Sequence, residues 1–539
     1  MASAQITVYY QQTFQHTQNQ LRIPEQAAYD PTILEAPAIP DPLPPYAIRY
    51  RAPEPGTHQG YRYHRLGNFV GFSIEMSVTN QLLGKNSSYI QVPFLNLMAN
   101  LEKRGGRVNT AVLVESLDGG RMIHKDVENV SNPTETPPLD YTTDLFYIMR
   151  NISDLVNVYW YLGIPFYNTS EFQLAIAEQG QAILGDYLLG LQAGNEPDLY
   201  QRHGHRSDAT GHPEMVWDTG FVDMYNDNLA YLSVEHYPSD NCAAQYGSSY
   251  GEARDPQMMF PRYLNHTAGQ ALAKLYLNST SYAQNKGKPL IMFETNTASC
   301  GGFPGVSDSF GAALWGLDYA MQLAYSNFSG ALMHVGGQGV YYNVSPPTNQ
   351  STFRQWTIGP IYYSALVIAE ALGSSESGSQ IADLNANDGN IYTPAYAIYE
   401  SGNPVRVALF NYITDPSGAS NYTASIYAGE NVQQVRVKYL SADSVSQKGS
   451  FKWAGQTFGD HFASDGRLMG DEDVRTSLCL LRGSHWCFFV HDEVVDVETQ
   501  TFPTTVQTRT VNTATVAEGV LATSNGHHWA AGGGIWEHE

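Results

Sequence analysis

Short apolar runs alternate with amphipathic stretches between residues 60 and 375. Six runs have the length of buried strands, and four longer stretches repeat apolar residues every three or four positions, as helices do. This alternation indicates a parallel α/β architecture, and the segments near 101–115 and 216–222 are expected to complete the eight strands of a barrel. The six strands are predicted at 69–76, 158–166, 188–193, 229–234, 290–293 and 331–335, and the helices at 171–184, 262–277, 310–325 and 361–372.

The hydrophobic period changes to two after about residue 380, in segments rich in Val, Thr and Tyr. This pattern predicts an antiparallel β-sandwich, with strands at 395–399, 405–413, 422–427, 432–440, 486–491 and 504–515. The first 58 residues combine one strand-like segment, 6–10, with a Pro-rich stretch that cannot form its own core. We therefore predict an N-terminal arm (1–58) that adds a strand to the β-domain, a (β/α)8 TIM barrel (59–378) and a C-terminal β-sandwich (379–539).

Composition narrows the classes of function. The chain of 539 residues carries 29 basic and 52 acidic side chains, a formal net charge of −23. Nucleic-acid binding and anionic-membrane anchoring need clustered positive charge, so neither is expected. Ten N-x-[ST] sequons and four cysteines without CxxC spacing indicate a secreted glycoprotein with disulfides, whose export signal is missing from the N-terminus. No metal site, cofactor or membrane span is expected, and the oligomeric state stays open.

Two apolar strands each end in a glutamate. Glu196 follows the strand at 188–193 within Asn195-Glu196-Pro197, and Glu294 ends the run that begins at Leu290. The carboxyl ends of barrel strands surround the active site, so both side chains are expected in one pocket. Such a pair supplies the proton donor and the anion that glycoside cleavage needs. For either glutamate alone, a simple helix cap is an equally good explanation.

Three further motifs each have a functional and a purely structural interpretation. Tyr237 ends another strand, where its hydroxyl would hold Glu294 ionised, although a packing tyrosine is common in a chain with 36 of them. Residues 247–251 match the G-x-S-x-G elbow of esterases, but a loop rather than an apolar strand precedes them, which disfavours that chemistry. His203 and His205 lack a third metal ligand nearby and are interpreted as histidines at the pocket rim.

The motifs together resemble glycoside hydrolase family 79, which contains β-glucuronidases and heparanases. The resemblance rests on five segments: Asn195-Glu196-Pro197, His236-Tyr237, Phe293-Glu294-Thr295, Cys300-Gly301-Gly302 and the run from Val306 to Phe310. It implies a secreted retaining exo-β-glucuronidase that acts on carbohydrates containing glucuronic acid. A β-glycosidase for neutral sugars and a non-catalytic carbohydrate-binding barrel remain the alternatives.

The resemblance also implies a role for each site residue. Glu196 would be the acid/base and Glu294 the nucleophile, while Asn195 would bind the sugar 2-hydroxyl and Glu75 hydroxyls on the far side of the ring. The uronic carboxylate would be held by Gly301, Gly302 and the segment that contains Gly339 and Tyr341, or Tyr342 if the register shifts by one. Cys242 and Cys300 follow neighbouring barrel strands and are expected to pair, as are Cys479 and Cys487 across a hairpin.

Overall fold

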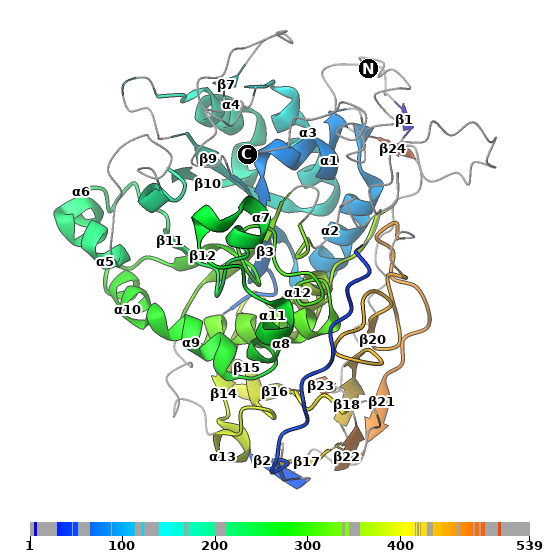
Figure 1. The fold of residues 1–539 in the computed structure, drawn as a ribbon. Coiled ribbons are helices and arrows are strands. Elements are labelled where there is room, and N and C mark those ends of the chain that lie inside the picture. The colour runs from blue at the N-terminus through cyan, green and yellow to red at the C-terminus, as the bar shows by residue number, and fades with distance from the viewer. Residues whose placement is uncertain are drawn as a thin grey trace.

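Seven parallel strands form a curled sheet in the order β10-β9-β6-β3-β13-β12-β11, a TIM-like half-barrel that confirms the predicted fold class (Figure 1). The computed structural model describes residues 5–7, 30–45, 47–51, 65–87, 89–113, 121–122, 140–165, 170, 172–199, 212–336, 340–343, 356–415, 417, 420, 422–427, 435–460, 464–477, 480–483, 487–490 and 505–507. The barrel strands are β3 (Val70–Glu75), β6 (Val108–Leu113), β9 (Val158–Ile164), β10 (Leu188–Ala193), β11 (Leu232–Glu235), β12 (Leu290–Thr295) and β13 (Gly330–Val335).

The central strands are apolar on both faces because both faces are covered. Every residue of β12 and β13 is buried. Helices pack outside the sheet, and a separate apolar cluster fills its inside, as in other closed or nearly closed sheets. This inner cluster consists of Ala111, Leu113, Tyr161, Ile291, Phe293 and Leu332.

The predicted strand at 216–222 is wrong. The segment is helical, with α5 (Pro213–Val216), the π-helical turn η5 (Trp217–Phe221) and α6 (Val222–Met224). Pro213 occupies the first helical turn, where its fixed φ favours a helix, and only Trp217 and Val222 are buried. An apolar run this short does not distinguish a helix from a strand by its period. The described residues therefore contribute seven barrel strands rather than eight.

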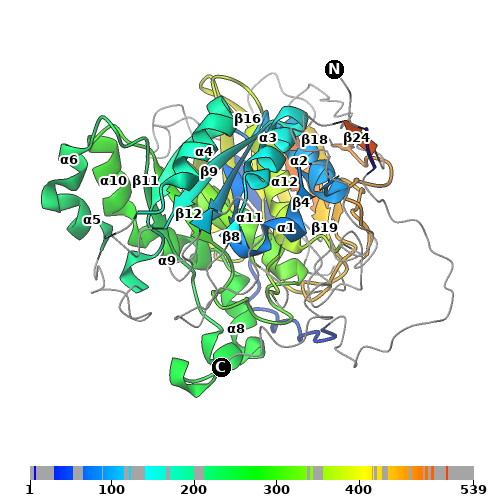
Figure 2. The ribbon, with the colours of Figure 1, turned by 90° about the horizontal axis from the view of Figure 1, so that it is seen from above.

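Helices surround the sheet, as Figure 2 shows from above. The two most deeply buried are α11 (Phe310–Tyr325) and α12 (Pro360–Leu372), which pack against each other and against the C-terminal strands. Their continuous apolar surface follows from being covered on all sides. The remaining helices are α1 (Thr79–Leu82), α2 (Val92–Gly105), α3 (Asp144–Val156), α4 (Ala175–Leu184), α7 (Cys242–Tyr246), α8 (Pro256–Tyr263), α9 (Thr267–Leu275), α10 (Leu277–Asn285) and α13 (Ala386–Gly389).

Antiparallel sheets form the C-terminal part. A six-stranded sheet has the order β14-β15-β16-β23-β18-β21, and a three-stranded sheet has the order β2-β17-β22. Two strands of the N-terminal arm pair with C-terminal strands, β1 with β24 and β2 with β17. The domain boundaries themselves stay a prediction. These strands are β1 (Gln5–Thr7), β2 (Ala47–Arg51), β14 (Ser379–Asp383), β15 (Ala395–Glu400), β16 (Asn403–Leu409), β17 (Tyr422–Tyr427), β18 (Val435–Lys438), β21 (Arg475–Ser477), β22 (Leu480–Gly483), β23 (Cys487–Val490) and β24 (Thr505–Gln507).

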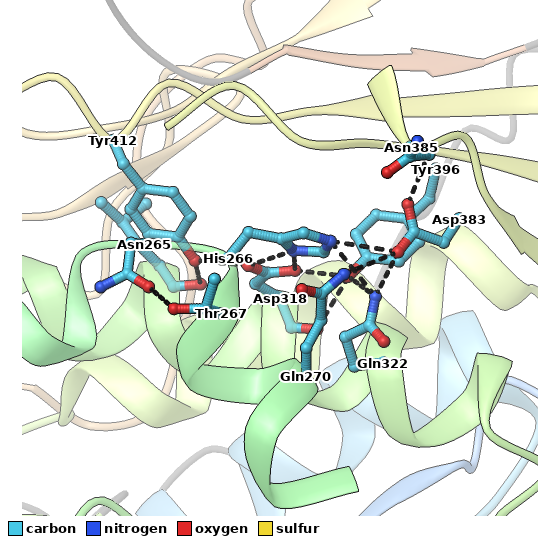
Figure 3. A network of polar contacts seen from close by, with 11 residues as sticks. Asn265, His266, Thr267, Gln270, Asp318, Gln322, Asp383, Asn385, Tyr396 and Tyr412 are labelled. Carbon is cyan, nitrogen blue, oxygen red and sulfur yellow. Dashed lines mark hydrogen bonds and ion pairs between the residues drawn. The ribbon is translucent and has the colours of Figure 1, made fainter. Parts of the chain in front are cut away.

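A buried polar network joins the barrel helices to the six-stranded sheet (Figure 3). The two ring nitrogens of His266 lie 3.0 Å from Asp318 of α11 and 3.0 Å from Asp383 of β14. Burial alone would lower the pKa of His266, but the two carboxylates outweigh it and raise this pKa to about 10. Gln322 and Tyr412 complete the network by donating to Asp383 and Asp318. A buried charge matched in this way fixes how the two parts pack.

A second ionic cluster centres on Glu370 of α12. Its carboxylate accepts from Arg104 of α2, from Lys438 of β18 and from the indole of Trp453. Burial alone would raise the pKa of Glu370, but Lys438 and Arg104 outweigh burial and lower it. The cluster therefore ties one barrel helix to another and to the C-terminal sheet.

Candidate active site

Glu294 lies near the carboxyl end of β12 and is only 5% exposed. Its Oε1 accepts a hydrogen bond of 2.8 Å from the hydroxyl of Tyr237, and its Oε2 lies 3.4 Å from Nδ1 of His334. Burial, helped by the charge of Glu75, raises the pKa of Glu294 to about 7 even though the hydrogen bond from Tyr237 lowers it. The Tyr237 hydroxyl thus favours the ionised form, as predicted from the sequence.

Aromatic rings enclose this carboxylate. The rings of Tyr237, His334 and Tyr342 are mutual neighbours, with centroids 5.9 to 6.4 Å apart. Burial lowers the pKa of His334 to about 4, so its imidazole is neutral near pH 7 and adds no positive charge. Sequence reasoning did not identify His334, although it ends a predicted strand in the same way as the two glutamates.

Glu196 follows β10 in an unusual backbone conformation. Its φ is +37°, and that of Gly194 is +84°. A positive φ is costly for a residue with a Cβ and is found preferentially at functional sites. The charge of Glu196 raises the pKa of both Glu235 and Tyr237, so its carboxylate lies near these two groups.

Asn195 belongs to a chain of hydrogen bonds that sequence reasoning missed. Its Oδ1 accepts from Nε2 of Gln192 at 2.9 Å, and the same nitrogen donates to Oε1 of Glu235 at 2.7 Å. Gln192 belongs to β10 and Glu235 ends β11, so the bond links the two edge strands of the sheet. The signal was present in the sequence, because the strand that begins at Leu232 also ends in a glutamate.

Glu75 ends β3 on the other side of Glu294. Its Oε1 accepts from the hydroxyl of Ser77, and its charge raises the pKa of Glu294. Ser73 of the same strand lies 3.2 Å from Nδ1 of His334 through its hydroxyl. Parallel pairing of β3 with β13 places these polar side chains next to one another.

Three loops meet beside the carboxylates. The predicted Cys242–Cys300 disulfide is present and joins the loop after β11 to the loop after β12. The amide of Asn241 donates to the carbonyl of Gly302 at 2.9 Å, and the backbone N–H of Tyr341 donates to the carbonyl of Gly301 at 2.7 Å. Gly301 and Gly302 have φ of +85° and +79°, a conformation that favours glycine.

The two candidate tyrosines of the third loop point in different directions. Tyr341 donates its hydroxyl to Asp30 of the N-terminal arm at 2.8 Å. Tyr342 is 4% exposed and contacts the rings of Tyr237 and His334. A Cβ at Gly302 would come within 3.0 Å of the Tyr342 ring. This geometry favours Tyr342, the alternative register, as the tyrosine that faces the pocket.

The arm crosses the surface next to these loops, as the dark blue trace that leads to β2 in Figure 1 shows. Glu35 and Gln257 exchange two hydrogen bonds, and a Cβ at Gly305 would contact Leu34. Lys448 donates to the carbonyl of Asp30 at 3.2 Å and pairs with Asp308 at 2.8 Å. The arm is thus attached to the loop that follows Glu294.

Other predicted features fall outside the site or outside the described residues. The esterase-like Ser249 lies exposed after α7, with a helix rather than a strand before it. Gly339, His203, His205 and Cys479 lie outside the described residues, so the Cys479–Cys487 pairing stays a prediction. Within the described part of the chain, no helix is long and apolar enough to cross a membrane.

Residues 395–483 match the glycosyl hydrolase family 79 C-terminal beta domain. The chain is also similar to curated β-glucuronidases from Aspergillus niger, 31% identical over 228 residues, and from Neurospora crassa, 32% identical over 170 residues. These alignments cover 39% and 29% of this chain, and they span 40% and 30% of the two relatives. The family resemblance seen in the sequence is thereby confirmed.

The solved structures agree with the fold. A 4-O-α-L-rhamnosyl-β-D-glucuronidase from Fusarium oxysporum 12S superimposes with a TM-score of 0.63 at 18% identity. The superposition covers 82% of this chain and all of that one. The arrangement of a TIM-like barrel and a C-terminal β-domain is therefore shared over most of the chain.

Proposed function

We propose that this protein is a retaining exo-β-glucuronidase that removes terminal β-linked glucuronic acid from glycans or small glucuronides. The observation that carries the proposal is the pocket at the carboxyl ends of β10, β11 and β12, where Glu196 acts electrostatically on the Tyr237 that holds Glu294. The names of the fungal relatives support glucuronic acid as the sugar that is removed. Their β-glucuronidase activity supports a glucuronide rather than a neutral glycoside as substrate.

The chemistry follows from the two carboxyl groups. Glu294 would attack the anomeric carbon while Glu196 gives its proton to the departing glycosidic oxygen, which forms a covalent glycosyl-enzyme. Glu196, now ionised, would take a proton from water as that water attacks the anomeric carbon and releases Glu294. The Tyr237 hydroxyl would hold Glu294 anionic and aimed before the first step, and would bind its carboxylate again when the second step releases it.

The uronic carboxylate would lie against the loops that contain Gly301, Gly302 and Tyr342. Backbone N–H groups and a phenol can bind one carboxylate without a neighbouring cation. The formal charge of −23 makes a sulfated polymer an unfavourable substrate, because long-range repulsion opposes a polyanion. We therefore expect terminal cleavage of short or otherwise neutral glycans and little cleavage of heparan sulfate.

One pair of substrates tests the proposal. Hydrolysis of p-nitrophenyl β-glucuronide but not of the β-glucoside supports a glucuronidase, whereas preference for the glucoside supports the neutral-sugar alternative. Proton NMR of the first-formed product should show the β-anomer, since double displacement retains configuration. A first-formed α-anomer would contradict the mechanism, and no turnover of either substrate would favour a carbohydrate-binding barrel.

The proposal includes an extracellular location, supported by the disulfide and by ten sequons. Two of these sequons are poor acceptors in the folded chain, because the side chains of Asn151 and Asn343 are buried and hydrogen-bonded. Asn278 is exposed on α10 and is the better candidate. Mass spectrometry of protein secreted by a fungal host should find glycan at Asn278 and none at the two buried positions.

A further inference from the structure

A third glutamate, Glu235, lies in the pocket beside the two that the proposed mechanism uses. Glu235 pairs in register with Glu294 on the neighbouring parallel strand, after an irregularity that follows Val234. Neighbours in register on a sheet face the same side, so both carboxyl groups face the inside of the barrel. Oε1 of Glu235 accepts from Gln192, and Oε2 is buried without a hydrogen-bond partner among the described residues.

The Gln192 side chain contacts both Glu235 and Asn195 through its Nε2 atom. Its Nε2 carries two hydrogens, and the two oxygens beside it are Oε1 of Glu235 and Oδ1 of Asn195. Donating to both fixes the amide plane of Gln192 between β10 and β11. It also fixes Asn195, because an asparagine that accepts through Oδ1 must direct its Nδ2 the other way.

The charges around Glu235 make its neutral form the stable one. Burial raises the pKa of Glu235 well above the usual range for a glutamate, and the nearby carboxylates of Glu294, Glu196 and Asp198 raise it further. A neutral carboxyl has one carbonyl oxygen that accepts and one hydroxyl that donates. The hydrogen bond from Gln192 lowers the pKa of Glu235 and so opposes burial and the neighbouring carboxylates without outweighing them, and Oε1 accepts it in either state.

We propose that Glu235 is a positioning residue: through Gln192 it holds Asn195 with Nδ2 directed at the sugar 2-hydroxyl. This rests on the proposed function, because the sugar contact belongs to the glucuronidase mechanism. Glu235 needs no charge and transfers no proton. It supplies one hydrogen-bond acceptor at a defined place.

Two variants separate this role from a catalytic or a purely structural one. Glu235→Gln keeps an acceptor oxygen at the same position, whereas Glu235→Leu removes it with little change in volume. We expect Glu235→Gln to keep kcat/KM for p-nitrophenyl β-glucuronide within about threefold, and Glu235→Leu to lose about 10- to 100-fold, the range for a mispositioned hydrogen bond. Ser233→Ala, an exposed residue of the same strand, is the control for both.

The 2-deoxy analogue of the same glucuronide localises the effect. Glu235→Leu and wild type should hydrolyse this analogue at equal rates, because there is no 2-hydroxyl for Asn195 to bind. Equal losses on both substrates, or equal losses in Glu235→Gln and Glu235→Leu, would overturn the proposal. Gln192→Leu breaks the same link from β10 and should give the same pattern, which keeps the test decisive if Glu235→Leu does not fold.

Infrared spectroscopy tests the neutral state without any turnover. The difference spectrum of wild type minus Glu235→Gln near pH 6.5 should contain the C=O stretch of one protonated carboxyl group. The exposed Glu252, replaced by Gln, should remove carboxylate bands instead and serves as the control. Carboxylate bands in the Glu235 difference spectrum would show that Glu235 is ionised and would refute its neutral state. A wild type that hydrolyses no glucuronide would refute the proposed function but would not change the infrared result.

Discussion

Replacing Tyr237 with Phe removes one hydroxyl and keeps the ring. In the wild type this hydroxyl donates to Oε1 of Glu294 at 2.8 Å, while the ring contacts His334 and Tyr342. Burial and the charge of Glu294 raise the pKa of Tyr237 well above its usual value, so the phenol keeps its proton at any pH of interest. The substitution therefore removes a donor from the nucleophile and leaves its apolar surroundings in place.

The size of the effect follows from the charge on the acceptor. A hydrogen bond to an ionised group is worth about 1.5 to 3 kcal/mol, and one pKa unit corresponds to about 1.4 kcal/mol. The bond stabilises the carboxylate over the carboxylic acid, so losing it raises the pKa of Glu294 by about one to two units. Because the nucleophile must be ionised, the acidic limb of the kcat/KM profile should move to higher pH by the same amount.

The measurement is kcat/KM for p-nitrophenyl β-glucuronide as a function of pH, for wild type and Tyr237→Phe. The value of kcat/KM should fall about 10- to 100-fold on the acidic limb and much less on the plateau. A pKa of Glu294 that is higher by about one to two units lowers the ionised fraction of Glu294 only where the pH is below the new pKa. Tyr341→Phe is the matched control, because that hydroxyl donates to Asp30 and does not contact Glu294. A lower plateau with an unmoved limb would refute the reasoning.

Four other substitutions have defined outcomes. Glu294→Ala should abolish turnover, whereas Glu196→Ala should spare substrates with very good leaving groups, which need little protonation; equal kcat/KM losses on good and poor leaving groups would reject that role for Glu196. Cys242→Ser opens a covalent link across 58 residues and should destabilise the fold by up to about 4 kcal/mol, measured as a lower Tm without reductant. Glu370→Gln should cost about 3 to 5 kcal/mol of unfolding free energy at pH 7, measured in urea. The pKa of Glu370 in the folded protein lies below its usual value. Its contribution to the free energy of unfolding is therefore fully present above the ordinary carboxyl range and is lost as the pH falls through the folded pKa. A destabilisation by Glu370→Gln that does not change with pH would contradict this.

The sequence predicted those elements whose pattern is decided by burial. α11 has the predicted bounds, because a long apolar helix that is buried along almost its whole length has few alternatives. The helical segment at 213–224 has exposed apolar residues such as Phe221 and Met224, so its hydrophobicity did not report burial. Local pattern was misleading where the side chains do not face the core.

The two glutamates of the proposed catalytic pair could be found from the sequence, but their hydrogen-bonded surroundings could not. Glu196 and Glu294 each end a strand, which is a local signal. The hydrogen bond from Tyr341 to Asp30 joins residues 311 positions apart, and the one from Gln192 to Glu235 joins residues 43 apart. Such pairs arise from how the sheet curls and where the arm crosses it. A single sequence taken alone does not show either arrangement.

Under the proposed function, the polar groups of this pocket would have to bind an anionic sugar without repelling it. The groups that raise the pKa of Glu235 are all acidic, and the imidazole of His334 is neutral, so the pocket lowers its negative charge by holding protons rather than by pairing with cations. In the proposed mechanism Glu196 carries the proton that it donates, and Glu294 is the anion next to the anomeric carbon, with Glu75 farther around the ring. In that proposal the uronic carboxylate would bind at the glycine loop that the Cys242–Cys300 disulfide holds. In this arrangement the buried carboxyl groups serve different functions because their surroundings keep one charged and another neutral.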